Sequence, residues 1–167
     1  MQERKVGDVL ITRVIESERP DFDAGQFFPN ITAEQWGPYR QRLSGWAMDV
    51  ASNGLVFPMQ AFLVRTKHHT IVVDTCVGND KPREVKNWHL RKGRFLEDLA
   101  QAGFPPERVT HVVCTHLHVD HVGWNTKLEN GKWVPTFANA RYLWNRAEYE
   151  HWSKTEQSDY GQVVQES

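Results

Sequence analysis

The heptapeptide Thr115-His116-Leu117-His118-Val119-Asp120-His121 is the most informative part of this sequence, because it gathers three histidines and one aspartate in seven residues. It follows the apolar run from Val109 to Cys114, whose β-branched residues favour a short buried strand. Open α/β sheets place their ligand sites in the loops at the carboxyl ends of such strands. The position and the composition of the heptapeptide therefore both predict a ligand site.

The spacing within the heptapeptide predicts metal binding. In an extended chain, residues two apart project to the same side, so His116 and His118 form a pair of imidazoles. Asp120 continues that alternation, whereas His121 is expected to point elsewhere. This geometry suits one metal held by His116 and His118 beside a second held by Asp120 and His121. Neutral imidazole and carboxylate oxygen are ligands that Zn²⁺ prefers, and other divalent metals remain candidates.

The surrounding pattern of apolar residues predicts strands and helices in alternation. We expect strands at 61–64 and 70–74, joined by a polar turn, then a helix that ends near Gly103, and the strand at 109–114. A strand, a helix and a strand in that order form a right-handed crossover, so the strands at 70–74 and 109–114 are expected to run parallel. The heptapeptide then lies at the carboxyl end of a parallel strand.

The region before this crossover carries weaker signals. A β-rich segment at 9–15 is followed by a loop-rich region at 16–58, with one short helix begun by the capping-box pair Thr32 and Gln35. Its aromatic residues are expected to form a satellite core under a long loop or a hydrophobic lip over a substrate pocket. They are Phe22, Phe27, Phe28, Trp36, Tyr39, Trp46 and Phe57.

Two further segments complete the expected secondary structure. The basic run at 81–94 is interpreted as a solvated helix face, with a patch for an anionic substrate or RNA as the alternative. A strand is expected at 140–144. A helix through Trp152 should follow, because Asn145 and Glu148 have the chemistry of its N-cap and third residue.

The sequence resembles the metallo-β-lactamase superfamily through its His-x-His-x-Asp-His signature, which here reads THLHVDH and is followed by Val122-Gly123. Further matching features occur in the same order: Val72-Val73-Asp74-Thr75, the helix end at 99–103, two prolines before the strand, PTFANARYLW and RAEYEHW. The resemblance covers about 59–152 and is closest to the branch that contains acyl-homoserine-lactone lactonases and methyl parathion hydrolase. It implies an α/β (α+β) fold, the N-terminal half of a four-layered αβ/βα sandwich.

The resemblance also implies roles for individual residues. His116 and His118 would ligate the first metal, and Asp120 and His121 the second. Asp120 would in addition be catalytic, because it orients the nucleophile or helps to move its proton. Asp74 would lie beneath the metals and support the ligands.

One departure from the family pattern lies in the turn after Asp74. Cys76 stands where many members of the family have glycine. Gly78 is expected to supply the flexibility that this turn needs.

The whole chain, residues 1–167, is interpreted as a single and apparently incomplete domain. The family completes its two-metal site with further His and Asp residues, and after His121 this chain offers only His151 and Asp159. A half-fold would leave one sheet face and one edge uncovered, which favours association with a partner such as a second copy in a homodimer.

The expected function is that of a metal-dependent hydrolase in which two zinc ions activate water for attack on a lactone, ester or similar acyl bond of a small-molecule substrate. Two alternatives remain open. The same fold also serves mononuclear iron dioxygenases that act on sulfur substrates. The chain could instead be a non-catalytic half-domain that associates with a partner.

Composition excludes several other classes of protein. The formal net charge is -1, which is unlike a dedicated nucleic-acid binder. No apolar run approaches the roughly 18 residues of a membrane span, and the N-terminus lacks the apolar core of a signal peptide, so a cytoplasmic location is expected. Cys76 and Cys114 are the only cysteines and are expected to be buried free thiols.

Overall fold

The computed structural model describes residues 2–154 as two compact units. The first unit contains residues up to Glu16 and from Met59 onward, and the second contains Ser17–Pro58. The heptapeptide belongs to the first unit. The sequence-based expectation of one domain over 1–167 stays a prediction.

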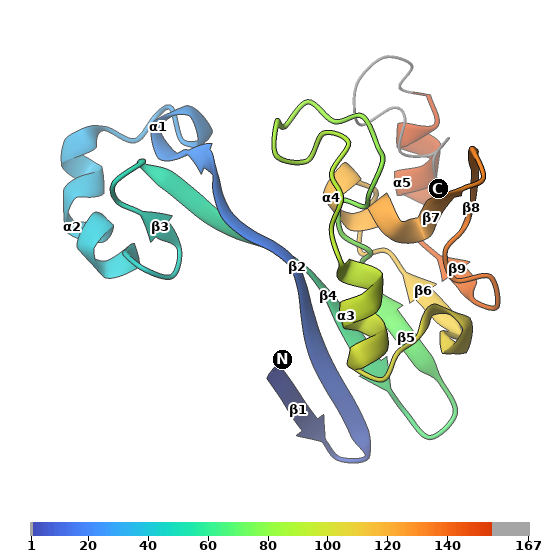
Figure 1. Cartoon of the computed structure of the whole chain (residues 1–167). Coiled ribbons are helices and arrows are strands. Elements are labelled where there is room, and N and C mark those ends of the chain that lie inside the picture. The colour runs from blue at the N-terminus through green and yellow to red at the C-terminus, as the bar shows by residue number, and fades with distance from the viewer. Residues whose placement is uncertain (1, 155–167) are drawn as a thin grey trace. The chain divides into compact units, whose positions relative to one another are not determined.

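The described elements alternate between strands and short helices (Figure 1). The strands are β1 (Gln2–Val6), β2 (Val9–Asp23), β3 (Met48–Asp49), β4 (Gly54–Arg65), β5 (Thr70–Val73), β6 (His111–Val113), β7 (Thr126–Glu129), β8 (Lys132–Pro135) and β9 (Arg141–Leu143). The α-helices are α1 (Ala24–Phe27), α2 (Ala33–Leu43), α3 (Phe95–Gln101), α4 (Val119–Val122) and α5 (Arg146–Trp152). Two turns of 3₁₀-helix are η1 (Pro106–Arg108) and η2 (Gly123–Asn125).

One mixed sheet organises the chain, and its strand order is β1-β2-β4-β5-β6-β9, with β3 paired to β4 (Figure 1). β4 and β5 form the expected antiparallel hairpin. β5 pairs with β6 in parallel, and β6 pairs with β9 in parallel, so that Val72, Val112 and Tyr142 stand in register across three strands. The predicted α/β fold and its parallel crossover are therefore confirmed.

The core of the first unit explains why α3 covers the crossover. Val72 of β5 and Val112 of β6 are completely buried, as is Leu99 of α3, while Phe95 of α3 is 1% exposed. Burial of such side chains contributes about 1.5–3 kcal/mol each. The helix ends where predicted, because Gly103 adopts a left-handed conformation with φ +83°, which other residues adopt only at a cost.

The second unit is more regular than the sequence predicted. The expected strand at 9–15 extends to Asp23, and β4 already begins at Gly54, so the region at 16–58 is not mainly loop. Alternation of side chains is hard to recognise there because prolines and glycines interrupt it. The capping box at the start of α2 is confirmed: Thr32 Oγ1 accepts from the Gln35 amide at 3.3 Å, and Gln35 Oε1 accepts from the Thr32 amide at 2.8 Å.

The aromatic residues of the second unit divide between a small core and the surface. The buried residues Ala24, Met48 and Leu55 form this core, and it is extended by the partly buried Phe22, Trp36, Leu43 and Phe57. In contrast, Phe27, Tyr39 and Trp46 are exposed. The satellite core expected from the sequence is thus present, although only part of the aromatic set belongs to it.

The basic run at 81–94 is not a solvated helix face, and this prediction was wrong. The segment is a loop without regular helix, and Lys81 and Arg83 are only 1% and 4% exposed. The Lys81 ammonium donates to Thr126 Oγ1 at 2.8 Å and lies 3.9 Å from the centre of the Trp133 ring. The number of charged residues did not predict the burial of Lys81, because a hydroxyl and an aromatic face can together accommodate a buried ammonium.

Tyr142 of β9 links the sheet to Asn125 of η2 and to Phe137, which follows β8. Its hydroxyl donates to the Asn125 carbonyl and accepts from the Phe137 amide, both at 3.0 Å. Burial raises the pKa of Tyr142 to about 12, so the hydroxyl keeps its proton at neutral pH.

Tyr142→Phe is expected to lower the free energy of unfolding by about 1–3 kcal/mol, because it leaves two backbone groups without their partner. Urea denaturation measures this loss. Tyr39→Phe is the matched control, since Tyr39 is exposed. Equal unfolding free energies for the two variants would contradict the prediction.

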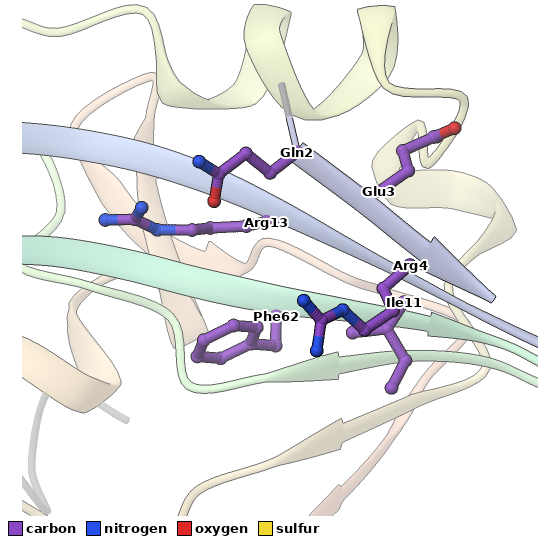
Figure 2. Close-up of a pocket in the computed structure, with 6 residues that line it drawn as sticks. All are labelled: Gln2, Glu3, Arg4, Ile11, Arg13 and Phe62. Carbon is purple, nitrogen blue, oxygen red and sulfur yellow. The ribbon is translucent and has the colours of Figure 1, made fainter. Parts of the chain in front are cut away.

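A shallow hollow of about 520 Å³ lies along β1, β2 and β4 (Figure 2). It is lined by Gln2, Glu3, Arg4, Ile11, Arg13 and Phe62. None of these residues belongs to the histidine heptapeptide, so the hollow is separate from the predicted site. Among residues 2–154, each helix is too short or too polar to cross a lipid bilayer.

Candidate functional site

The heptapeptide connects β6 to α4, as its position after an apolar strand predicted. Thr115, His116 and Leu117 are non-helical, and His118 is the N-cap of α4 with extended dihedral angles. Asp120 and His121 lie within the helical turn. The alternation expected from an extended chain therefore ends at His118.

The three imidazoles gather at one place. The ring centres of His116 and His118 are 4.5 Å apart, and those of His116 and His121 are 4.0 Å apart. The expectation that His121 points away was wrong, because His121 lies in the helical turn of α4, where the two-residue alternation of an extended chain no longer applies. Asp120 joins the cluster, with its Oδ2 atom 3.4 Å from His121 Nε2.

Asp74 holds the cluster from the neighbouring parallel strand. It follows β5 directly, and its Oδ1 atom accepts from the Thr115 amide at 2.8 Å. Its Oδ2 atom accepts from the Thr115 hydroxyl and lies 2.9 Å from His121 Nδ1. The Asp74 carboxylate contacts Nδ1 of His121 and the Asp120 carboxylate faces Nε2, so the imidazole lies between two carboxylates.

Burial, hydrogen bonds and neighbouring charges shift the pKa values of His116, Asp120 and His121. Burial lowers the pKa of His116, and the charges of His121 and His118 add to this effect. Burial acts in the same direction on His121, but hydrogen bonds and charges from Asp120 and Asp74 outweigh it and raise its pKa to about 9. Burial favours a higher pKa for Asp120, yet the hydrogen bond to His121 holds it below its ordinary value.

The turn after Asp74 packs directly against the segment after α4. The Thr75 amide donates to the His121 carbonyl at 2.7 Å, and the Gly123 amide donates to the Cys76 carbonyl at 2.7 Å. Gly78 has φ +81°, and a Cβ atom there would lie 2.6 Å from the Gly123 carbonyl oxygen. Gly78 thus supplies the backbone freedom expected of it, and Cys76 is itself left-handed with φ 54°.

Two groups on α5 support the heptapeptide, and the sequence did not reveal their role. Glu148 Oε2 accepts from the Leu117 amide at 3.0 Å and from Trp152 Nε1 at 3.0 Å. The Trp152 ring lies edge to face with His118, with 5.4 Å between the ring centres. Asn145 caps α5 as predicted, but the Glu148 carboxylate contacts the heptapeptide in place of the N-cap backbone.

Both cysteines are buried free thiols, which confirms the prediction. Burial raises the pKa of Cys76 well above its ordinary value and that of Cys114 to about 11. Both sulfurs therefore stay protonated at neutral pH and are poor nucleophiles and poor metal ligands.

Three imidazoles and a carboxylate are donor types that zinc prefers, and one of these imidazoles contacts a further carboxylate, that of Asp74. Within residues 2–154, however, no group of three or more His, Cys, Asp or Glu side chains converges in a way that could hold a metal ion. His151 lies on α5, where its ring contacts Trp152. Asp159 lies outside the described residues.

Comparisons with known proteins agree on one family. The sequence model described as the metallo-beta-lactamase superfamily matches residues 55–159. An N-acyl homoserine lactonase of Bacillus cereus is 29% identical over 113 residues, which cover 59% of this chain and 40% of that protein. A second N-acyl homoserine lactonase, from Bacillus sp, is 29% identical over 111 residues. The chain thus spans less than half the length of these relatives.

Solved structures show the same fold. The hydrolase AbOPH of the beta lactamase superfamily superposes with a TM-score of 0.71 at 24% identity, covering 98% of this chain and 54% of that one. AidC, a dizinc quorum-quenching lactonase, superposes with a TM-score of 0.69 at 21% identity, covering 92% of this chain and 47% of that one. These partial coverages fit the expected half of the fold. The chain belongs to the metallo-beta-lactamase superfamily.

Proposed function

We propose that this chain carries part of the active site of a metal-dependent hydrolase that acts on a lactone, ester or similar acyl bond of a small molecule. The observation that carries the proposal is the grouping of the His116, His118 and His121 rings, with the Asp74 carboxylate 2.9 Å from His121 Nδ1. A carboxylate in contact with one ring nitrogen is the usual support of a histidine that binds a metal.

In this proposal, His116 and His118 hold one zinc ion, and Asp120 and His121 hold a second. Two such cations would lower the pKa of a bound water towards neutrality and would polarise the acyl oxygen. Asp120 orients the attacking group, and Asp74 and Thr115 keep the heptapeptide in place. The remaining ligands of the site would then be groups other than those that the structure brings together within residues 2–154.

The reaction and the partners belong to the proposal as well. The curated relatives are lactonases, but this chain covers only 40% of their length, so the activity of a whole protein is inferred for it. The homodimer expected from the sequence would cover the sheet face of a half-fold, and size-exclusion chromatography with light scattering measures it.

Metal content and hydrolysis together test the proposal. The purified chain is analysed for zinc and iron, then assayed against a panel of homoserine lactones and aryl esters before and after chelation and re-addition of zinc. We expect zinc to bind and the rate of hydrolysis to follow zinc content. Iron as the native metal with thiol-dependent oxygen uptake would support the dioxygenase instead. A chain that binds no metal and turns over no substrate would support the non-catalytic half-domain.

Asp74→Asn is expected to weaken zinc binding by about 10–100-fold, the usual effect of removing a group that orients a metal-bound histidine. The amide keeps the size of the side chain but loses one of the two oxygens that contact Thr115 and His121. Chelator competition measures the affinity. Asp8→Asn, on the exposed turn after β1, is the matched control. Equal zinc affinity in both variants would contradict the role given to Asp74.

A further inference from the structure

Glu16 has a buried carboxylate and lies far from the heptapeptide in the sequence. It is not one of the proposed metal ligands. It lies in β2, and its side chain is only 1% exposed. Both of its oxygens are fully used. Oε1 accepts from the Gly78 amide at 3.2 Å and from Trp124 Nε1 at 2.7 Å. Oε2 accepts from the Val77 amide at 2.9 Å and lies 3.0 Å from Arg91 Nη1.

Arg91 fixes this carboxylate from the basic loop. Besides the ion pair, its Nη2 atom donates to the Glu16 carbonyl at 3.2 Å. Burial raises the pKa of Glu16, while the Arg91 charge and the hydrogen bonds from Val77, Trp124 and Gly78 oppose the increase. A buried carboxylate is costly unless it is paired and hydrogen-bonded, so its three hydrogen bonds and its ion pair all matter.

The three hydrogen-bond donors of Glu16 belong to two segments that adjoin Asp74 and His121 in the chain. Val77 and Gly78 continue the turn after Asp74, and Trp124 follows α4 after one intervening glycine. These segments also contact each other directly, because the Trp124 amide donates to the Thr75 carbonyl at 2.9 Å. Glu16 therefore binds both of these segments. The same two segments are joined by the hydrogen bond from the Thr75 amide to the His121 carbonyl.

We propose that Glu16 is a positioning residue for the histidine heptapeptide. Its carboxylate, oriented by Arg91, binds the amides of the turn after β5 and the indole of Trp124. It thereby sets the register between the segment that carries Asp74 and the segment that carries His121. The consequence for metal binding rests on the proposed function, whereas the positioning itself does not.

Glu16→Gln tests the positioning with little change in side-chain size. Each carboxylate oxygen accepts from or faces two donors, so an amide NH₂ group at either position would meet donors. We expect the amides that join the two segments, those of Thr75, Gly123 and Trp124, to exchange hydrogen at least about tenfold faster. The sheet amides of Cys114 and Arg141 serve as internal references, because they bond to Leu143 and Thr110.

A second variant guards against a general loss of stability. Trp124→Phe removes the 2.7 Å indole donor and part of the buried ring volume, and it keeps an aromatic ring against Phe95, on which Trp124 stacks at 6.0 Å. It should accelerate exchange at the same three amides to a smaller extent. Glu129→Gln and Trp46→Phe are the matched controls, since both residues are exposed. Exchange accelerated equally at the joining and the reference amides in both test variants would overturn the proposal.

Cobalt binding, followed by its visible absorption, connects the positioning to the site. We expect Glu16→Gln to bind cobalt about tenfold more weakly than the wild-type chain and Glu129→Gln to match it. Unchanged cobalt affinity in Glu16→Gln would contradict positioning of the metal ligands by Glu16. If the wild-type chain binds no cobalt, the proposed function fails on that count, while hydrogen exchange still decides whether Glu16 positions the heptapeptide.

Discussion

His116→Ala is expected to reduce zinc binding by more than about a hundredfold and to bring hydrolysis to the uncatalysed rate. His116 is the central imidazole of the cluster, with neighbouring ring centres at 4.5 Å and 4.0 Å. Loss of a group that only orients a ligand costs about 10–100-fold in affinity, and loss of the ligand itself must cost more. Without the metal, water keeps its high pKa and is a poor nucleophile.

His68→Ala is the matched control for this prediction. His68 lies on the exposed turn between β4 and β5, outside the heptapeptide. Elemental analysis and chelator competition are performed on both variants together with circular dichroism, so that loss of metal is distinguished from loss of fold. Zinc retained at the wild-type level by a folded His116→Ala chain would remove His116 from the site and with it the proposed two-metal arrangement.

Gly123→Ala is expected to destabilise the protein by about 3 kcal/mol or more, at the upper end of the effects of overpacking. A Cβ atom at this position would lie 1.9 Å from the carbonyl carbon of Val77 and 2.5 Å from the amide nitrogen of Gly78. These are backbone atoms, so no side-chain rotation relieves the clash. The dihedral angles of Gly123 are ordinary helical values, φ -58° and ψ -44°, so space alone requires glycine here.

Gly37→Ala is the control for Gly123→Ala. Gly37 lies within α2, and apart from its neighbours in the chain and the helix backbone no atom stands within 4 Å of the position that its Cβ atom would take. Alanine there should change stability by no more than about 1 kcal/mol, because its better helix propensity is opposed by Pro38, which disfavours a helical backbone at the residue before it. Chemical denaturation measures both variants. A Gly123→Ala chain as stable as the wild type would show that Gly123 does not pack tightly against the backbone of Val77 and Gly78.

The positions of the candidate ligands and the crossover beneath them could be predicted from local sequence patterns. The apolar run before Thr115 places the heptapeptide after a strand, and the helix end at Gly103 separates two parallel strands as expected. The pair Thr32 and Gln35 caps α2 as predicted, because a capping box depends only on residues three apart. Such features are set by neighbours in the chain, which a single sequence contains.

The groups that support the site could not be predicted in the same way. Glu16 lies 61 residues before Val77 and 108 before Trp124, and nothing in its own neighbourhood marks it as buried. Glu148 has the spacing of a capping residue, yet its carboxylate contacts Leu117, which is 31 residues away. The direction of the His121 side chain was likewise predicted wrongly, because the alternation rule assumed that the chain remains extended after His118.

By itself, the sequence determined which donor groups lie close together along the chain, since three imidazoles and a carboxylate fall within seven residues. Tertiary structure alone decided how those groups are oriented. The ring of His121 in α4 lies beside that of His116, the Asp74 carboxylate contacts Nδ1 of His121, and Glu16 binds the two segments from a third strand. The physical reason is that residue types follow from local sequence, whereas the hydrogen bonds that orient them are formed between segments that only folding brings together.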